Sequence, residues 1–174
     1  MRKLHQNMLF TVVVIALMTA GTAFAGTATA NMAVSANVSA DCQIAASSLG
    51  FGVYDPVSAN GPGGTDAATT ANLSVICSSG STANITLDQG LNAAGGSTDG
   101  LPLRQMADGG SDRLAYTIYQ DGGHTTIWGN TSETGVNYEG TGSVTNVTVF
   151  GVAPKGQSIP SGTYNDLVVA TITF

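Results

Sequence analysis

The sequence has few charged residues, and it is especially poor in basic ones. Charged residues make up 9% of its 174 positions. After residue 25 the basic residues are Arg104, Arg113 and Lys155, against eleven acidic residues, which gives a net charge of −8 (three minus eleven). Such a surface repels phosphate backbones, so nucleic acid is not an expected partner. The chain is nevertheless not of disordered composition, because 43% of its residues are hydrophobic and these fall in patterned runs.

The chain also lacks the residue sets that common catalytic and metal sites require. After residue 25 its only histidine is His124, and no G-x-S-x-G elbow, H-E-x-x-H pair or P-loop occurs. Paired carboxylates could in principle serve glycoside hydrolysis, but most of the acidic residues lie in turn-like stretches. The stretches DGGSD at 108–112 and DGGH at 121–124 lack the alternating ligands and closing glutamate of a calcium loop. We therefore expect no enzymatic activity, no cofactor and no metal site.

The first 25 residues have the features of an export signal. A basic start, Met1-Arg2-Lys3, precedes an apolar run at 8–18, and Ala-Phe-Ala at 23–25 forms a small-x-small cleavage site. Eleven residues are too few to cross a bilayer, which needs about 20. We expect export with cleavage after Ala25, which leaves a mature chain of one domain's size.

The two cysteines, Cys42 and Cys77, are 35 positions apart. In an exported chain a disulfide is the simplest interpretation, and closing a loop of this size contributes roughly 3–4 kcal/mol in the chain-entropy model. A metal site is the weaker alternative, since two thiols without nearby histidines cannot complete a tetrahedral shell.

Short runs with a period of two predict an all-β protein. Apolar residues alternate with others at 49–53, 73–77, 83–87, 114–118, 146–150 and 167–174. Clusters of Gly, Asp, Asn and Ser separate these runs and supply the conformations that turns need. After residue 25 no run of helical period exceeds about two turns. The pattern is typical of an antiparallel β-sandwich.

Several motifs together resemble the spore coat protein U domain, and within it the major pilin subunits of archaic chaperone–usher pili. In order, they are an N-terminal arm, Cys42, the pair Phe51-Gly52, Cys77 after a V-x-C run, LAYTIYQD at 114–121, F-G-x-x-P at 150–154, G-x-Y-x-D at 162–166 and a final strand. This order covers essentially the whole chain after the signal.

The resemblance implies a self-assembling structural protein. Subunits of this family resemble immunoglobulin-type sandwiches that lack their last strand and so keep an open apolar groove. A periplasmic chaperone lends a strand to that groove, and at an outer-membrane usher the arm of the next subunit replaces it. The implied partners are other copies of the chain, the chaperone and the usher, and the implied location is the cell surface, with roles in adhesion and biofilm formation. The alternative is a secreted β-sandwich binding module, such as a tip or minor pilin, an adhesin or a spore-coat-like protein.

Two segments are the expected assembly sites. In the arm, Met32, Val34, Ala36 and Val38 point to one side if the stretch is extended. In the last strand, Val168, Ala170, Ile172 and Phe174 share one face, which in the family flanks the groove. We therefore divide the chain into a signal at 1–25, a donor-strand arm at 26–40 and a pilin-type domain at 41–174.

The arm has two alternative interpretations. It could be a disordered chain end, or the first strand of its own sandwich. In the donor interpretation, the boundary between the donated strand and the chain's own first strand falls between Val34 and Asp41.

Overall fold

The computed structural model describes residues 24–174, so nearly all of the predicted export signal lies outside the described residues. The chain divides into two units, Met1–Ala36 and Asn37–Phe174, which are described separately below. Over the described part of the chain, no helix combines the length and apolar character needed to cross a membrane.

Residues 24–174 form strands and no helix. The strands are β1 (Cys42–Ala46), β2 (Ala67–Cys77), β3 (Thr82–Leu87), β4 (Arg104–Ala107), β5 (Arg113–Tyr119), β6 (Val136–Glu139), β7 (Thr145–Ala153) and β8 (Ala170–Thr173). The expected all-β class is confirmed.

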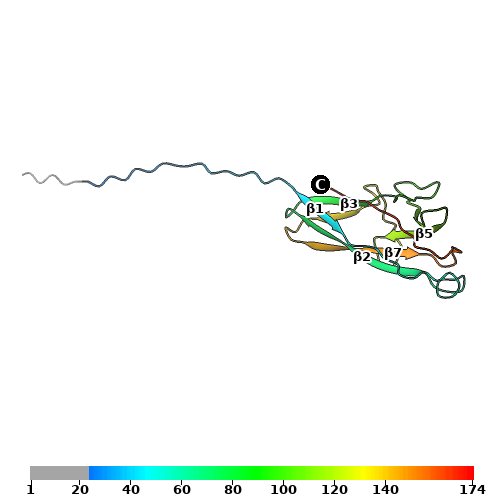
Figure 1. The fold of residues 1–174 in the computed structure, drawn as a ribbon. Helices are drawn as coiled ribbons and strands as arrows, with labels where there is room; N and C mark the ends of the chain where they lie inside the picture. The colour runs from blue at the N-terminus through cyan, green and yellow to red at the C-terminus, as the bar shows by residue number, and fades with distance from the viewer. Residues whose placement is uncertain (1–23) are drawn as a thin grey trace, which may run out of the picture. The chain divides into compact units, whose positions relative to one another are not determined.

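The strands form two antiparallel sheets that face each other across one core (Figure 1). The larger sheet has the order β1-β2-β7-β5-β4, and the smaller has the order β6-β3-β8. Alternate residues of β2, β3 and β5 are buried between the sheets, which is the period expected of strands with one buried face. This arrangement is an immunoglobulin-type sandwich that lacks one strand.

The disulfide predicted from the sequence is present between Cys42 and Cys77. The two cysteines are also directly opposite each other in the antiparallel pair of β1 and β2. Just before β1, the Asp41 amide donates to Ser78 Oγ at 3.1 Å, and the Ser78 amide donates to the Asp41 carbonyl at 2.9 Å. The first strand of the domain is therefore fixed at its very start.

One charged side chain lies inside the sandwich. Arg104 of β4 is 1% exposed and donates from Nε and Nη2 to the carbonyls of Leu87, Asp88 and Trp128, at 2.6–2.9 Å. Burial lowers the pKa of its guanidinium from the ordinary value. Because these carbonyls belong to the end of β3 and to the segment that enters the 129–135 turn, Arg104 joins chain segments that no strand pairing connects.

The acidic residues at 108–112 and 121–124, the stretches compared above with calcium loops, make hydrogen bonds within turns. Asp121 accepts hydrogen bonds from the amides of Thr125 and Thr126, which lowers the pKa of its carboxyl. Asp108 accepts from the Gly110 amide at 2.8 Å. Both carboxylates stabilise the turns in which they lie.

The prediction of a strand at 49–53 is wrong. This segment has no regular secondary structure, and Gly52 has a φ of 70°, a conformation that interrupts an extended strand. The strand predicted at 167–174 is shorter than expected, since β8 begins only at Ala170. Strands β4 and β6 were missed because each has four residues and carries a charged residue.

We expect Arg104→Met to lower the free energy of unfolding of the mature chain by about 3 kcal/mol, because it removes the shared donor of three carbonyl groups. Urea denaturation followed by tryptophan fluorescence measures this, since Trp128 is fully buried. The matched control is Arg113→Met: the Arg113 guanidinium donates only to carbonyls of its own loop, Gly110 and Asp112. Equal stability of both variants would contradict this role for Arg104.

Candidate functional site

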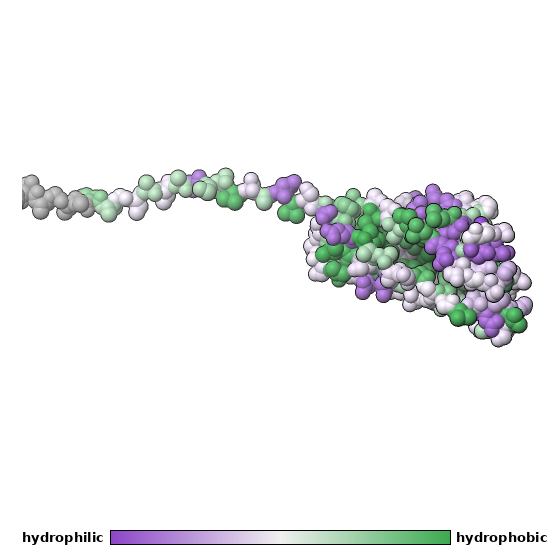
Figure 2. Space-filling view, viewed as in Figure 1, coloured by the Kyte–Doolittle hydropathy of each residue, from purple (hydrophilic) through white to green (hydrophobic). Residues whose placement is uncertain are grey.

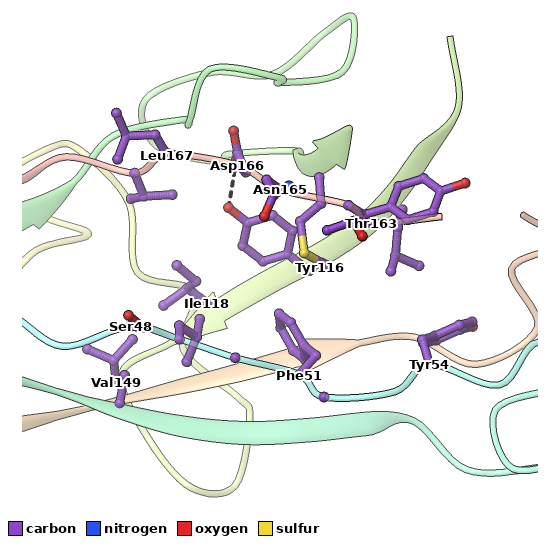
Figure 3. A pocket seen from close by; sticks show the side chains of 18 of the residues that line it. Ser48, Phe51, Tyr54, Tyr116, Ile118, Val149, Thr163, Asn165, Asp166 and Leu167 are labelled. Carbon is purple, nitrogen blue, oxygen red and sulfur yellow. Dashed lines mark hydrogen bonds between the residues drawn. The ribbon is translucent and has the colours of Figure 1, made fainter. Parts of the chain in front are cut away.

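An apolar groove of about 1030 Å³ runs along the domain. Its first wall is residues 46–56 and its second wall is residues 159–170, which face each other in Figure 3. The floor consists of core side chains of β2, β5 and β7 together with two neighbours: Ala71, Leu73, Leu87, Met106, Leu114, Tyr116, Ile118 and Val149. The groove therefore runs directly over side chains of the core, which apart from Met106 are 3–7% exposed.

The walls carry backbone groups that no strand pairs. Ser47 still donates to the Asn72 carbonyl, but residues 48–53 make no backbone hydrogen bond to another described residue. In the second wall, Asn165 pairs with Ala107 and Val169 accepts from Asp88, while the backbone groups of residues 166–168 have no backbone partner among the described residues. Both walls thus present free donors and acceptors to an added strand.

Asp166 anchors the second wall. Its carboxylate accepts from the amides of Leu91 and Asn92, at 3.0 and 3.2 Å, and from the Asn92 side chain at 3.0 Å. The Tyr116 hydroxyl on the groove floor donates to Asp166 Oδ2 at 2.7 Å (Figure 3). Burial, reinforced by this hydrogen bond, raises the pKa of Tyr116 well above its ordinary value. These hydrogen bonds hold the second wall in place.

The first wall is held by packing over a glycine and by a polar contact at its end. A Cβ on Gly151 of β7 would lie 2.9 Å from Leu49 and 3.1 Å from Phe51, so both side chains rest where Gly151 leaves space. Phe51 also meets Tyr116 edge-to-face, with ring centroids 5.8 Å apart. Farther along, the Tyr54 hydroxyl donates to the Pro154 carbonyl at 2.7 Å. The segment mistaken for a strand is therefore an ordered groove wall.

The arm, considered by itself, presents apolar side chains to solvent. Residues 24–40 form no strand in the structure. Met32, Val34 and Val38 are 86–87% exposed, and Ala36 is exposed as well. In Figure 2 the described part of the arm is coloured mostly from white to green, with few hydrophilic positions. Since β1 begins at Cys42, the arm is not the first strand of this sandwich.

The predicted residues of the last strand are distributed unevenly around the groove. Val168 and Ala170 line it. Ile172 is half-buried and packs against the core cluster, whereas Phe174 lies beyond the end of β8 and is 55% exposed. Sequence reasoning missed Tyr116 and Asp166 as groove residues, although both lie within the motifs quoted above, LAYTIYQD and G-x-Y-x-D.

The groove offers packing and hydrogen bonding to a peptide backbone. Its walls and floor are mostly apolar, and its free polar groups are mainly backbone amides and carbonyls. Within residues 24–174 no group of three or more His, Cys, Asp or Glu side chains is placed to hold a metal ion.

Three comparisons with known proteins agree with this geometry. Residues 28–171 match the model of the Spore Coat Protein U domain. The chain is 50% identical over 155 residues to Protein U of Myxococcus xanthus, covering 86% of this chain and 87% of that protein.

A solved structure shares the fold. It is the crystal structure of the CsuC–CsuE chaperone–tip adhesion subunit pre-assembly complex from archaic chaperone-usher Csu pili of Acinetobacter baumannii, with a TM-score of 0.55 and 21% identity. The match covers 79% of this chain and 40% of the other. With the family model covering most of its length, this chain belongs to the Spore Coat Protein U domain family.

Proposed function

We propose that this protein is a structural subunit of a surface pilus, assembled by donor-strand complementation through a periplasmic chaperone and an outer-membrane usher. The observation that carries the proposal is the open groove, whose two walls have unpaired backbone groups above an apolar floor. In this proposal the filament reaches the cell surface and serves adhesion and biofilm formation, and the chain acts by assembly and not by catalysis.

The arm matches the needs of the groove in chemistry. An added strand contributes backbone hydrogen bonds to the walls and seats every second side chain in the apolar floor. Met32, Val34, Ala36 and Val38 supply four apolar side chains at that spacing, and all four are exposed in the unpaired chain. Burying an exposed valine or methionine side chain contributes roughly 1.5–3 kcal/mol.

The arm also matches the groove in length. Ile118 is opposite Gly151, so Val149, Ile118, Tyr116 and Leu114 follow one another along the floor at two-residue intervals. Three such intervals span roughly 20 Å, and the segment from Met32 to Val38 has the same extended length. The sixteen residues at 26–41 reach roughly 50 Å, which is enough to fill the groove of another copy.

The unpaired backbone groups of the two groove walls support a chaperone-dependent pathway. An apolar groove beside unpaired edges is an aggregation hazard that cells cover until assembly. The structural neighbour from Acinetobacter baumannii is described as a chaperone–subunit pre-assembly complex. By analogy, we propose that Val168, Ala170, Ile172 and Phe174 form the segment that first pairs with a chaperone strand.

Removal of residues 26–38 from the mature chain should abolish filaments and leave the acceptor groove intact. The expected product is a subunit that accepts the arm of an intact copy but cannot extend the chain, so mixing it with intact protein should shorten the assemblies. Size-exclusion chromatography with light scattering measures both effects. Filaments formed by the truncated chain alone would refute the proposal.

Val34→Asp should reduce assembly by roughly a hundredfold or more, because an ionised side chain buried without a partner is costly. The matched control is Ser35→Asp, which places the same charge on the opposite side of the extended arm. Assembly is followed by light scattering at neutral pH. Equal behaviour of the two variants would show that Val34 does not enter the groove.

A further inference from the structure

The two methionines that follow residue 25, Met32 and Met106, both lie on surfaces that the proposed assembly uses. Met32 is in the arm and is 86% exposed. Met106 of β4 lines the apolar groove, where it is half-buried and directly opposite Leu114 of β5. No other thioether occurs after residue 25. The donor segment and the acceptor groove therefore carry one thioether sulfur each.

Other readily oxidised side chains do not compete with these two sulfur atoms. The two cysteines of the chain are bonded to each other, so neither offers a thiol to an oxidant. The single tryptophan, Trp128, is fully buried, and its indole N–H donates to the Ile85 carbonyl at 2.9 Å. Exposure to solvent governs the access of an oxidant to a thioether sulfur. Such access is high in the unpaired arm and is available in the open groove.

We propose that Met32 and Met106 are oxidation sites through which a peroxide prevents the free subunit from assembling. This inference rests on the proposed donor-strand function. The modification acts before assembly, because Met32 is exposed only while the arm is unpaired and Met106 is accessible only while the groove is open. Strand exchange then buries both sulfur atoms, so the assembled protein resists the oxidant that disables the free subunit.

The modification is the transfer of one oxygen atom from hydrogen peroxide to the thioether. A lone pair of the sulfur attacks one peroxide oxygen, so that the S–O bond forms as the O–O bond breaks. The hydroxide that leaves takes the proton from the transferred oxygen and becomes water. The sulfur loses two electrons and the peroxide gains them. The product is methionine sulfoxide, in which a flexible apolar side chain has become a polar one.

A sulfoxide opposes both roles that these residues have in strand exchange. On the arm, it places a strong hydrogen-bond acceptor at an inward position, and the groove that this position would enter is mostly apolar. At Met106, it adds the same kind of acceptor to the floor on which the added strand packs. A polar group that is buried without a hydrogen-bond partner opposes binding. Oxidation of Met32 therefore hinders donation, and oxidation of Met106 hinders acceptance.

The two sites differ in access, so they are oxidised in a fixed order. Met32 is 86% exposed in a segment without strand pairing, whereas Met106 is half-buried within β4. Mild peroxide treatment therefore produces copies that have lost donation and kept acceptance. Such copies stop the growth of a filament. Methionine sulfoxide reductases restore the thioether, and two enzymes are needed because the sulfoxide forms as two epimers.

The experiment compares the assembly of the mature chain before and after treatment with hydrogen peroxide. Light scattering gives the rate, and peptide mass spectrometry locates each added oxygen atom. The treated chain should assemble roughly tenfold or more slowly. Methionine sulfoxide reductases A and B together should restore the rate. The same peroxide should oxidise Met32 roughly tenfold or more slowly in assembled protein than in the free subunit.

Substitutions at the two sulfur positions identify the modification that stops assembly. Each variant is compared with its own untreated sample, so a change in its basal rate does not enter the result. Met32→Leu, a change outside the two sheets, should remove the effect of mild peroxide, and adding Met106→Leu should remove the effect of prolonged treatment. The matched control adds Ala33→Met to that pair, which returns an exposed thioether to the outward side of the arm. This control should gain an oxygen atom and still assemble as fast as its untreated sample.

Failure of the oxidation proposal is distinguishable from failure of the proposed function. Normal assembly of chains that carry a sulfoxide at Met32 and Met106 overturns the oxidation proposal. A peroxide effect that persists in the chain with both leucines, or an equal effect in the Ala33→Met control, also overturns it. If Val34→Asp still blocks assembly in these cases, donor-strand exchange stands. Normal assembly of Val34→Asp and of the arm-truncated chain overturns the proposed function and the oxidation proposal with it.

Discussion

The backbone groups of residues 48–53 and 166–168 face a shared space without backbone partners among the described residues, and most features of the domain relate to that space. Water can satisfy exposed amides and carbonyls, but it adds no close packing over the apolar floor of Leu73, Ile118 and Val149, which are 3–5% exposed. A β-strand meets both requirements at once, because its backbone bonds in the plane of the sheet and its alternate side chains point into the core. The open sandwich is therefore complementary to an extended peptide.

The groove keeps its shape because polar contacts hold the second wall to the rest of the domain. Asp166 connects this wall to Tyr116 of β5 and to the amides of Leu91 and Asn92, and Asn165 pairs with Ala107 of β4. Packing of the first wall over Gly151 has the same effect on the other side. A binding site whose walls are already ordered loses little conformational entropy when a strand enters. In the proposed function, the cost of ordering then falls mainly on the arm.

Much of the sandwich could be predicted from the sequence because its central strands obey one rule. In β2, β3 and β5, and in β7 as far as Gly151, every second residue faces the core, so alternation reveals these strands. The disulfide follows from two cysteines in an exported chain. The groove obeys no such rule. Residues 49–53 alternate like a strand but have no neighbour to pair with, and Arg104 lies in a strand yet is buried by carbonyls distant in sequence. The alternation of apolar residues indicates which face of a segment is buried, but it does not indicate whether a strand pairs with the segment on each side.

The linker between the arm and the domain bears on which groove the arm can enter. Along β2, Cys77 and Ala71 are six residues apart, which is roughly 20 Å. Ala71 is opposite Val149, and from there the groove floor continues toward Leu114 for roughly 20 Å more. The step from Val38 to Cys42, which lies opposite Cys77, spans at most roughly 14 Å. The arm is therefore too short to place Val38 at the Leu114 end of the groove of its own domain. The disulfide at Cys42 and the bonds between Asp41 and Ser78 prevent the chain from lengthening this linker by unpairing β1. In the proposed function, a short linker anchored at the β1 end thus disfavours self-complementation and leaves the arm to another copy.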